Sequence, residues 1–301
     1  MQTREPDENA KENSNPSAVT TSVIARNNGV LYIAFGVAYL AMTLVSFASL
    51  RKTNSSVNVH VVTNIAFDFT TVDGWDSNRD SFIFLDMPTE DNRKVKCALD
   101  QHTPFQRTIF LDCDTVVLKD LSMAWDLLDE FDIAIKQNAN PQRDPRKADP
   151  VIFRGYRAGA LPHWNSGVVL FRKNDKTRKF FERWWAAYTE GGLPFDQVAL
   201  AKTILAGGSE KFLSLDGRWN CSGPTVGRKR WLQSAMIFHY TTMMTPSVIS
   251  ELRSVDRYLV RSGLTARDVE SAIISRRMSR RKSLGFARYW LGELSFRLVD
   301  G

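Results

Sequence analysis

The feature that most constrains the fold is an apolar run from Thr108 to Leu118 that contains two carboxylates, Asp112 and Asp114. An apolar run with β-branched residues near both ends predicts a buried strand of a parallel sheet, so acidic groups inside it need a strong partner. Alternate side chains of a strand share a face, which puts Asp112 and Asp114 together and turns Cys113 away. Two such carboxylates at a strand end favour Mg2+ or Mn2+, which proteins often hold together with substrate phosphates.

Composition and charge set the outer bounds on fold and partner. The chain has 301 residues and 43% hydrophobic content, enough for one large α/β domain or a domain with an appendage. A net charge of +7 and a pI of about 9.4 favour polyanionic neighbours such as nucleotide phosphates, nucleic acid or an acidic membrane surface. Cys97, Cys113 and Cys221 form no zinc or redox motif. Reduced thiols and a cytoplasmic location are therefore expected.

The stretch from Gly29 to Leu50 contains no charged residue and allows two interpretations. One is a membrane span or signal anchor followed by Arg51 and Lys52. The other is a strand over residues 30–35, a turn at Gly36 and a helix over residues 39–51. Small and polar residues mingle with aliphatic ones in the second half, as in a helix covered by protein. A nucleotide-binding sheet also needs such a unit before its next strand, so we favour the strand-turn-helix.

The remaining pattern predicts three parts of the chain. Residues 1–28 are polar, with almost no aliphatic content, and are expected to be disordered. Residues 29–244 are expected to form one α/β domain, a mixed, mainly parallel sheet flanked by helices, with a long loop over residues 137–162. Its expected strands are 57–63, 81–85, 108–118, 132–135, 167–171, 212–215 and 236–240, and its expected helices are 93–101, 121–131, 177–188 and 196–205. Residues 245–301 are expected to form a helical, basic C-terminal appendage.

Four sequence segments share a resemblance. The segment 110–117, Phe-Leu-Asp-Cys-Asp-Thr-Val-Val, resembles the Asp-x-Asp strand of nucleotide-sugar-dependent glycosyltransferases of the GT-A fold, particularly the glycogenin-like (family 8) group. Three further segments, 30–39, 164–169 and 195–197, lie before and after it in the order that this group requires. The resemblance covers about residues 29–240. It implies a GT-A type fold and a nucleotide-diphosphate-sugar donor, a UDP-sugar in the closest group, used together with Mn2+ or Mg2+.

The resemblance also implies roles for individual residues. Asp112, Asp114 and a late histidine, His239, would bind the metal. The donor would contact Ala34 and Phe35 through their backbone, Tyr39 through stacking on the base, and also Lys96, Asp112, Asn165, Ser166 and Gly167. Asp196, Gln197 and Asn165 would face the sugar in a retaining reaction. Each site also has a structural reading: Asn165-Ser166-Gly167 can be a plain turn, Asp196 a helix cap, and His239 a buried structural residue.

The sequence departs from the family pattern after His239. A glycine and a lysine usually follow there and help to hold the phosphates, whereas this chain continues Tyr240-Thr241-Thr242-Met243-Met244. The phosphate clamp must therefore come from elsewhere. Lys96 and Arg107, on either side of the approach to the acidic run, are the candidates.

The C-terminal region raises a separate question. Five positive charges lie between Arg276 and Lys282, just before an aromatic-rich segment over residues 284–298. Such a segment can lie on an anionic membrane surface, or it can pack its apolar face on the parent domain and leave the charges in solvent.

Three classes of function fit parts of the chain. A metal-dependent glycosyltransferase with an unidentified glycan, lipid or protein acceptor explains the Asp-x-Asp strand, Asn165-Ser166-Gly167 and Asp196-Gln197 together. A nucleotidylyltransferase should have a glycine-rich, basic loop after its first strand, which Gly36-Val37-Ala38-Tyr39 lacks, and a catalytically weak nucleotide-sugar-binding protein is the neighbouring alternative. A nucleic-acid-binding protein should interleave basic and aromatic residues on a platform, and none is evident. The sequence favours the first class.

Overall fold

The computed structural model describes residues 27–138, 162–191, 195–222 and 234–239. A central sheet has the strand order β3-β2-β1-β4-β7-β6-β8. These strands are β1 (Asn28–Ala34), β2 (Asn58–Thr63), β3 (Ser81–Phe84), β4 (Arg107–Leu111), β6 (Ile133–Gln137), β7 (Trp164–Arg172) and β8 (Phe212–Leu215). Only β7 runs antiparallel to its neighbours in this sheet. The predicted mixed, mainly parallel sheet is confirmed.

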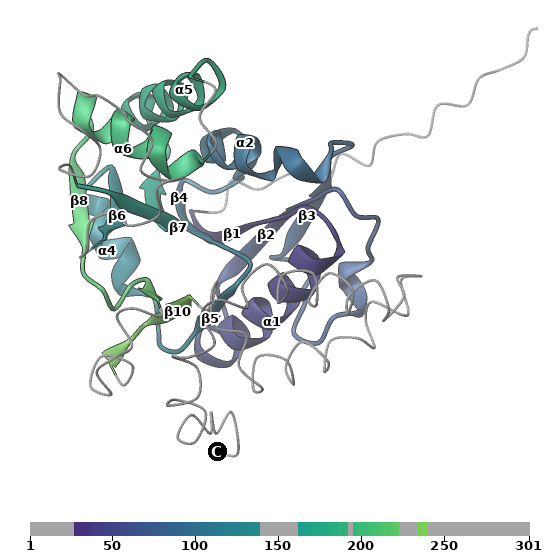
Figure 1. The fold of residues 1–301 in the computed structure, drawn as a ribbon. Helices are drawn as coiled ribbons and strands as arrows, with labels where there is room; N and C mark the ends of the chain where they lie inside the picture. Colours follow the sequence, from purple (N-terminus) through teal and green to yellow (C-terminus); the bar gives the residue numbers. More distant parts are fainter. Residues whose placement is uncertain (1–26, 139–161, 192–194, 223–233, 240–301) are drawn as a thin grey trace, which may run out of the picture.

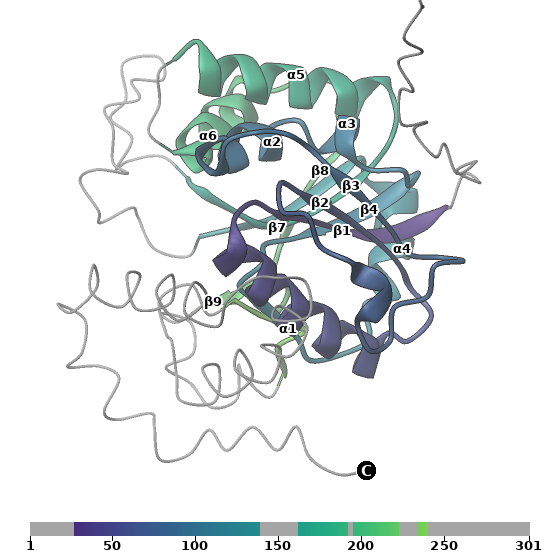
Figure 2. The same cartoon turned by 90° about the vertical axis from the view of Figure 1, so that its right-hand side faces the viewer.

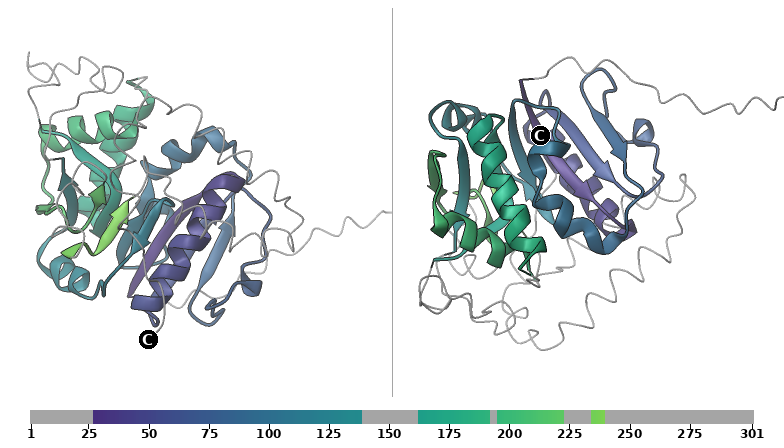
Figure 3. Two further views of the ribbon diagram at one scale, coloured as in Figure 1. Left: turned by 60° about the horizontal axis from the view of Figure 1, so that its bottom comes forward. Right: turned by 90° about the horizontal axis from the view of Figure 1, so that it is seen from above.

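Helices cover both faces of the central sheet (Figures 1 and 2). One face carries α2 (Asn92–Lys96), α3 (Leu99–His102), α5 (Asp175–Thr189) and α6 (Asp196–Ala206). The other face carries α1 (Val37–Thr53), α4 (Met123–Glu130) and a small sheet of β5 (Thr115–Val117), β10 (Ile237–His239) and β9 (Cys221–Ser222). Residues 69–71 and 89–91 form short 3-10 helices. Figure 3 shows that α1 lies along the strands of the central sheet.

The central strand β1 divides the core by the alternation of its side chains. Val30, Tyr32 and Ala34 belong to the apolar cluster on the α1 side. Leu31 and Ile33 belong to the cluster on the α5 side. Because successive side chains of a strand point to opposite faces, an unbroken apolar strand fills both cores at once. The strand could therefore be predicted from its continuous hydrophobicity.

The stretch from Gly29 to Leu50 forms the predicted strand, turn and helix. Gly36, with φ 88°, lies between β1 and α1, and its N–H donates to Asn64 Oδ1 at 2.7 Å. A positive φ of this size suits glycine because other residues meet steric strain there. Ten residues of α1 are buried, and none of the helices in the described segments is long and apolar enough to cross a membrane. The anchor interpretation of this stretch does not hold.

Two predicted elements are corrected by the structure. The helix expected over residues 93–101 is two short helices, α2 and α3, separated at Cys97 and Ala98. The strand expected over residues 108–118 is also two elements, β4 and β5, and the segment between them is a turn. The reason is that β4 stays in the central sheet while β5 pairs with β10 in the small one.

Three predictions fall mainly outside the described residues. They concern disorder over residues 1–28, of which Asn28 already begins β1, the loop over residues 137–162, and the helical appendage over residues 245–301. The proposed domain limits likewise stay predictions.

Candidate active site

Three segments meet at one edge of the central sheet. β4 ends there, and β7 begins there because it runs antiparallel to β4. The N–H of Asp112 donates to the carbonyl of Gly167 at 2.8 Å, so the two segments are joined just beyond the paired strands. Strand β10 brings His239 to the same place by pairing with β5, where His239 faces Thr115. Backbone pairing thereby brings Asp112, Gly167 and His239 together, although they are far apart in sequence.

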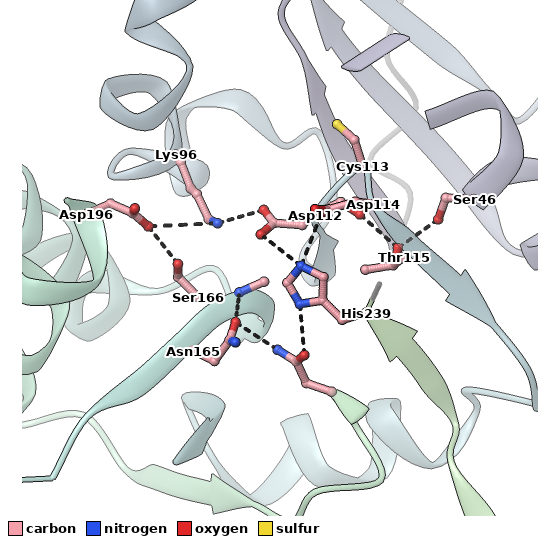
Figure 4. Close-up of polar contacts among 12 residues, drawn as sticks. Ser46, Lys96, Asp112, Cys113, Asp114, Thr115, Asn165, Ser166, Asp196 and His239 are labelled. Carbon is pink, nitrogen blue, oxygen red and sulfur yellow. Dashed lines mark hydrogen bonds and ion pairs between the residues drawn. The ribbon is translucent and has the colours of Figure 1, made fainter. Parts of the chain in front are cut away.

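Asp112, Asp114 and His239 form a compact group of potential metal ligands. One ligand atom from each residue can be chosen so that all lie within 4.8 Å of one another. His239 Nε2 lies 3.1 Å from Asp114 Oδ1 and 3.8 Å from Asp112 Oδ2 (Figure 4). Oxygen and imidazole nitrogen ligands at this spacing fit a divalent cation such as Mn2+.

The turn between β4 and β5 sets the direction of the two carboxylates. Thr115 Oγ1 donates to the carbonyl of Asp112 at 2.8 Å, and the Cys113 thiol donates to the carbonyl of Ile33 at 2.9 Å. Cys113 therefore points into the core, away from the carboxylates, as predicted (Figure 4). The expected arrangement of side chains is present, although a turn produces it instead of a continuous strand.

Buried hydroxyls of α1 hold β5 in position. Ser46 Oγ lies 2.8 Å from Thr115 Oγ1 and 3.0 Å from the Tyr32 hydroxyl. Ser49 Oγ accepts a hydrogen bond from the N–H of Val117 at 2.9 Å. Buried polar groups need such partners, and here the partners tie the first helix to the strand that follows the acidic pair.

Gly167 allows His239 to approach β7 closely. A Cβ atom at residue 167 would lie 2.3 Å from His239 Cε1 and 2.6 Å from Nδ1. Distances this short are steric clashes, so any side chain at this position would displace the imidazole ring. Glycine is thus needed because the ring packs directly on the backbone.

Lys96 links the metal-ligand group to a further carboxylate. Its Nζ lies 2.6 Å from Asp112 Oδ1 and 3.8 Å from Asp196 Oδ2. Burial opposes the charged amine, but the charges of Asp112 and Asp196 outweigh it and raise the pKa of Lys96. The amine is therefore a fixed positive charge beside the candidate cation site.

Asp196 is held by specific partners at the start of α6. Ser166 Oγ donates to Asp196 Oδ2 at 2.6 Å, and Trp184 Nε1 donates to the carbonyl of Asp196 at 2.9 Å. The residue is buried and its side chain does not cap the helix. Its carboxylate points towards Lys96 instead (Figure 4).

Electrostatics also indicate a cation. The Lys96 ammonium lies beside the carboxylates of Asp112 and Asp196, and the His239 imidazole lies beside those of Asp112 and Asp114. Burial raises the pKa of the Asp112 carboxyl in spite of Lys96 and His239, which act to lower it. The pKa of His239 is also raised: burial acts to lower it, but the Asp114 carboxylate outweighs burial. A metal would displace the proton of His239 and leave the imidazole neutral. The three carboxylates and one ammonium would then carry two negative charges, which a divalent cation would balance.

The other predicted site residues differ in burial and in position. Ala34 and Phe35 are fully buried at the end of β1. Tyr39 is half-buried in the first turn of α1, and Gln197 is half-buried beside Asp196. Asn165 Oδ1 accepts the N–H of Gly167 at 2.8 Å. Their contacts with a donor stay predictions.

The expectation for Arg107 is wrong. Arg107 begins β4, whereas Asp112 follows the end of that strand, about 16 Å away at 3.3 Å per residue. Its guanidinium pairs with Asp129 and donates to Asn28 Oδ1 at 2.7 Å. It is a structural residue at the opposite edge of the sheet.

Sequence reasoning missed Asn220. This fully buried residue precedes β9, and its Oδ1 lies 3.0 Å from His239 Nδ1. Its Nδ2 donates to Asn165 Oδ1 at 3.1 Å. A single asparagine between Trp219 and Cys221 carries no motif, so only the pairing of β9 with β10 reveals it.

Comparisons with known proteins concern the fold and the middle part of the chain. Residues 106–218 match the family model described as nucleotide-diphospho-sugar transferase. A crystal structure of an active-site mutant of LgtC has a similar fold, with 14% identity, a TM-score of 0.52, and 75% of this chain and 95% of that one covered. The apo structure of the bifunctional glycosyltransferase WbbM is also similar, with 14% identity, a TM-score of 0.53, and 88% of this chain and 53% of that one covered. No curated protein sequence matches the chain.

The fold comparison and the family match give different information. The chain has the GT-A fold, and its residues 106–218 are similar to nucleotide-diphospho-sugar transferases. Membership of the glycogenin-like group in particular stays a prediction.

Proposed function

We propose that the protein is a metal-dependent glycosyltransferase that transfers a hexosyl group from a UDP-sugar, with retention of configuration, to a sugar-containing or other hydroxyl acceptor. The observation that carries the proposal is the convergence of Asp112, Asp114 and His239, because Asp114 and His239 are 125 residues apart in sequence. The family match over residues 106–218 supports the donor class. The imidazole ligand favours Mn2+ over Mg2+.

The acidic pair and His239 would hold the cation beside the donor pyrophosphate. A bound divalent cation acts as a Lewis acid that stabilises the charge developing on the leaving pyrophosphate. Lys96 holds Asp112 in a fixed orientation through the 2.6 Å contact between Nζ and Oδ1. As a buried ammonium it also adds positive charge next to the phosphate side of the site, and it can supply part of the phosphate clamp that the family usually draws from a later lysine.

The sugar would lie between β7 and the start of α6. Asn165 uses its Oδ1 within the protein, which leaves its Nδ2 as the donor for a sugar hydroxyl. Asp196 is held by Ser166 and would accept a hydroxyl of the sugar, with Gln197 nearest the anomeric carbon. Gly167 would let the backbone approach the donor closely, just as it lets the His239 ring pack on the backbone. The nucleoside would contact the backbone of Ala34 and Phe35 and stack on Tyr39.

A catalytically weak nucleotide-sugar-binding protein is the second candidate. The observation that favours it is the sequence after His239, where Tyr240-Thr241-Thr242 replaces the family's glycine and lysine. The metal ligands and the other donor contacts are sufficient for binding, whereas turnover also requires that the leaving phosphate be neutralised. The two candidates therefore differ in turnover and agree in metal-dependent binding.

A thermal-shift panel of UDP-sugars with Mn2+, Mg2+ or chelator tests the proposal. A ligand that binds only the native state raises its melting temperature, so one UDP-sugar should do so with Mn2+ and not with chelator. Asp114→Ala should abolish this shift and the Mn2+-dependent hydrolysis of the same donor. The control is Asp126→Ala, which removes an exposed aspartate on α4.

The outcomes separate the candidates. Full hydrolysis in chelator, or normal hydrolysis by Asp114→Ala, contradicts the proposed metal role. A Mn2+-dependent shift without measurable turnover on any acceptor or on water supports the binding protein instead.

A further inference from the structure

Asn220 connects the candidate cation site to Asn165, the residue proposed above to face the donor sugar. Its side-chain amide contacts His239 through Oδ1 at 3.0 Å and Asn165 through Nδ2 at 3.1 Å. The residue is fully buried. An amide with both ends engaged in this way has one orientation, and neither neighbour can move without breaking a hydrogen bond.

Backbone geometry determines the direction of every hydrogen bond in this chain of contacts. The N–H of Gly167 can only donate, so the Asn165 atom that it meets at 2.8 Å is the oxygen. That oxygen can accept only a donor from Asn220, which must present its NH2 group to Asn165. The Asn220 oxygen then faces His239 and accepts the proton of Nδ1. When the ring is neutral, as a metal ligand must be, His239 is thereby fixed in the tautomer whose Nε2 lone pair faces Asp112 and Asp114.

The backbone of Asn220 is anchored separately. Lys136, a buried residue of β6, donates from Nζ to the carbonyl of Asn220 at 2.9 Å. Strand β9 begins at the next residue and pairs with β10, with Cys221 opposite Phe238. Asn220 is thus held through both its backbone and its side chain before any ligand binds.

We infer that Asn220 is a positioning residue that sets the metal-binding tautomer of His239 and, through Asn165, couples the cation to the donor sugar. The inference rests on the proposed function. A histidine that binds a metal through one ring nitrogen is commonly oriented by a hydrogen bond from the other, and loss of that partner typically weakens metal binding or activity. Here the same amide also fixes the sugar-facing asparagine.

Two variants separate the two halves of this role. Asn220→Ala removes both hydrogen bonds. Asn220→Asp keeps an oxygen that accepts the His239 Nδ1 proton but replaces the NH2 group that Asn165 needs. The control is Asn54→Ala, because Asn54 also uses both ends of its amide, donating to the carbonyl of Lys119 and accepting the N–H of Leu121, at the far end of α1.

Mn2+ affinity and donor affinity are the two measurements. Free Mn2+ is followed by electron paramagnetic resonance in a titration without nucleotide, and donor binding by calorimetry at saturating Mn2+ with the UDP-sugar that stabilises the wild type most. Asn220→Ala should weaken Mn2+ binding about 10- to 100-fold. Asn220→Asp should bind Mn2+ as the wild type does but bind the donor about tenfold more weakly, since one hydrogen bond is lost. Asn54→Ala should leave both affinities unchanged.

Each result decides the inference. Wild-type Mn2+ affinity in Asn220→Ala overturns the positioning of His239, and should that variant fail to fold, loss of Mn2+ binding in Asn220→Asp does the same. Unchanged donor affinity in Asn220→Asp overturns the coupling to Asn165. A wild type that binds no Mn2+ overturns the proposed function together with the inference, whereas a wild type that binds Mn2+ while both variants behave like it overturns the inference alone.

Discussion

The protein satisfies the buried Asp132 differently from the acidic pair of the same domain, the buried Asp114 and the half-buried Asp112. Asp132 Oδ1 accepts hydrogen bonds from Arg172 Nε and Asn174 Nδ2, both at 2.8 Å, and Oδ2 accepts the N–H of Lys211 at 2.7 Å. Burial acts to raise the pKa of Asp132, but these hydrogen bonds outweigh it and hold the pKa below the ordinary value. This carboxylate is neutralised within the protein.

The acidic pair at the candidate site has the opposite balance. Burial raises the pKa of Asp112, and the neighbouring Asp114 adds to the effect, while Lys96 and His239 compensate only in part. The difference teaches how a structural acid can be told from a ligand-binding one. On the proposed function, the structural carboxylate is matched by protein donors, whereas the acidic pair that would bind the cation keeps charge that the protein does not fully balance. Four predictions test this contrast. Each is measured as a free energy of unfolding in chelator, and two are also measured with Mn2+.

The largest effect is expected for Asp132→Ala. The substitution leaves the Arg172 guanidinium and the Asn174 amide without their acceptor, and breaking a buried pair costs about 3 kcal/mol when the remaining charge keeps some access to water. Urea unfolding should show this loss, and Asp126→Ala should show almost none. A loss below about 1 kcal/mol would mean that Asp132 does not anchor this part of the sheet.

Gly167→Ala is expected to cost about 2 kcal/mol through overpacking, because the new Cβ would lie 2.3 Å from His239 Cε1. Because the ring is displaced, Mn2+ should no longer raise the melting temperature of this variant. The matched control is Gly29→Ala, whose Cβ would lie 2.3 Å from Phe105 Cε2 at the opposite end of β1. That variant should be destabilised to a similar extent and keep the Mn2+ effect; if both lose it, the effect is not local to His239.

Asp100 is a buried carboxyl whose Oδ1 has no hydrogen-bond partner in the described part of the chain. Burial raises its pKa to about 6. A raised folded-state pKa contributes stability that is present below the unfolded value and is lost as the pH rises through about 6. Asp100→Asn should therefore stabilise the protein by about 1 kcal/mol at about pH 8 and by almost nothing at about pH 4. Equal effects at both pH values would show that ionisation of the Asp100 carboxyl costs the folded protein no stability.

The smallest effect on stability is expected for Asp114→Asn. The substitution loses part of the contact with His239 but also removes one of two neighbouring buried charges, so the free energy of unfolding in chelator should change by less than about 1 kcal/mol. In excess Mn2+ the wild type should become more stable and the variant should not. A loss as large as that of Asp132→Ala would make Asp114 a structural residue and remove the contrast.

The sequence by itself determined the elements whose signal is local. The unbroken hydrophobicity of β1, the glycine at residue 36 and the small residues within α1 each depend on near neighbours in the chain. They therefore predicted a buried strand, a turn and a covered helix, and the alternation of strands and helices predicted the mainly parallel sheet. The direction of Asp112 and Asp114 on one side, with Cys113 on the other, could also be predicted, because both an extended strand and the observed turn separate alternate side chains.

Tertiary structure decided where the chain leaves the central sheet and what surrounds the cation site. The turn after β4 exists because β5 pairs with β10 and is held by Ser46, 69 residues before Thr115. The contact of Asn220 with His239 depends on β9 pairing with β10, and the close approach of His239 to Gly167 depends on β10 lying across the start of β7. No local pattern encodes these contacts, since each hydrogen bond forms only after separate strands have been brought together by burial of the core.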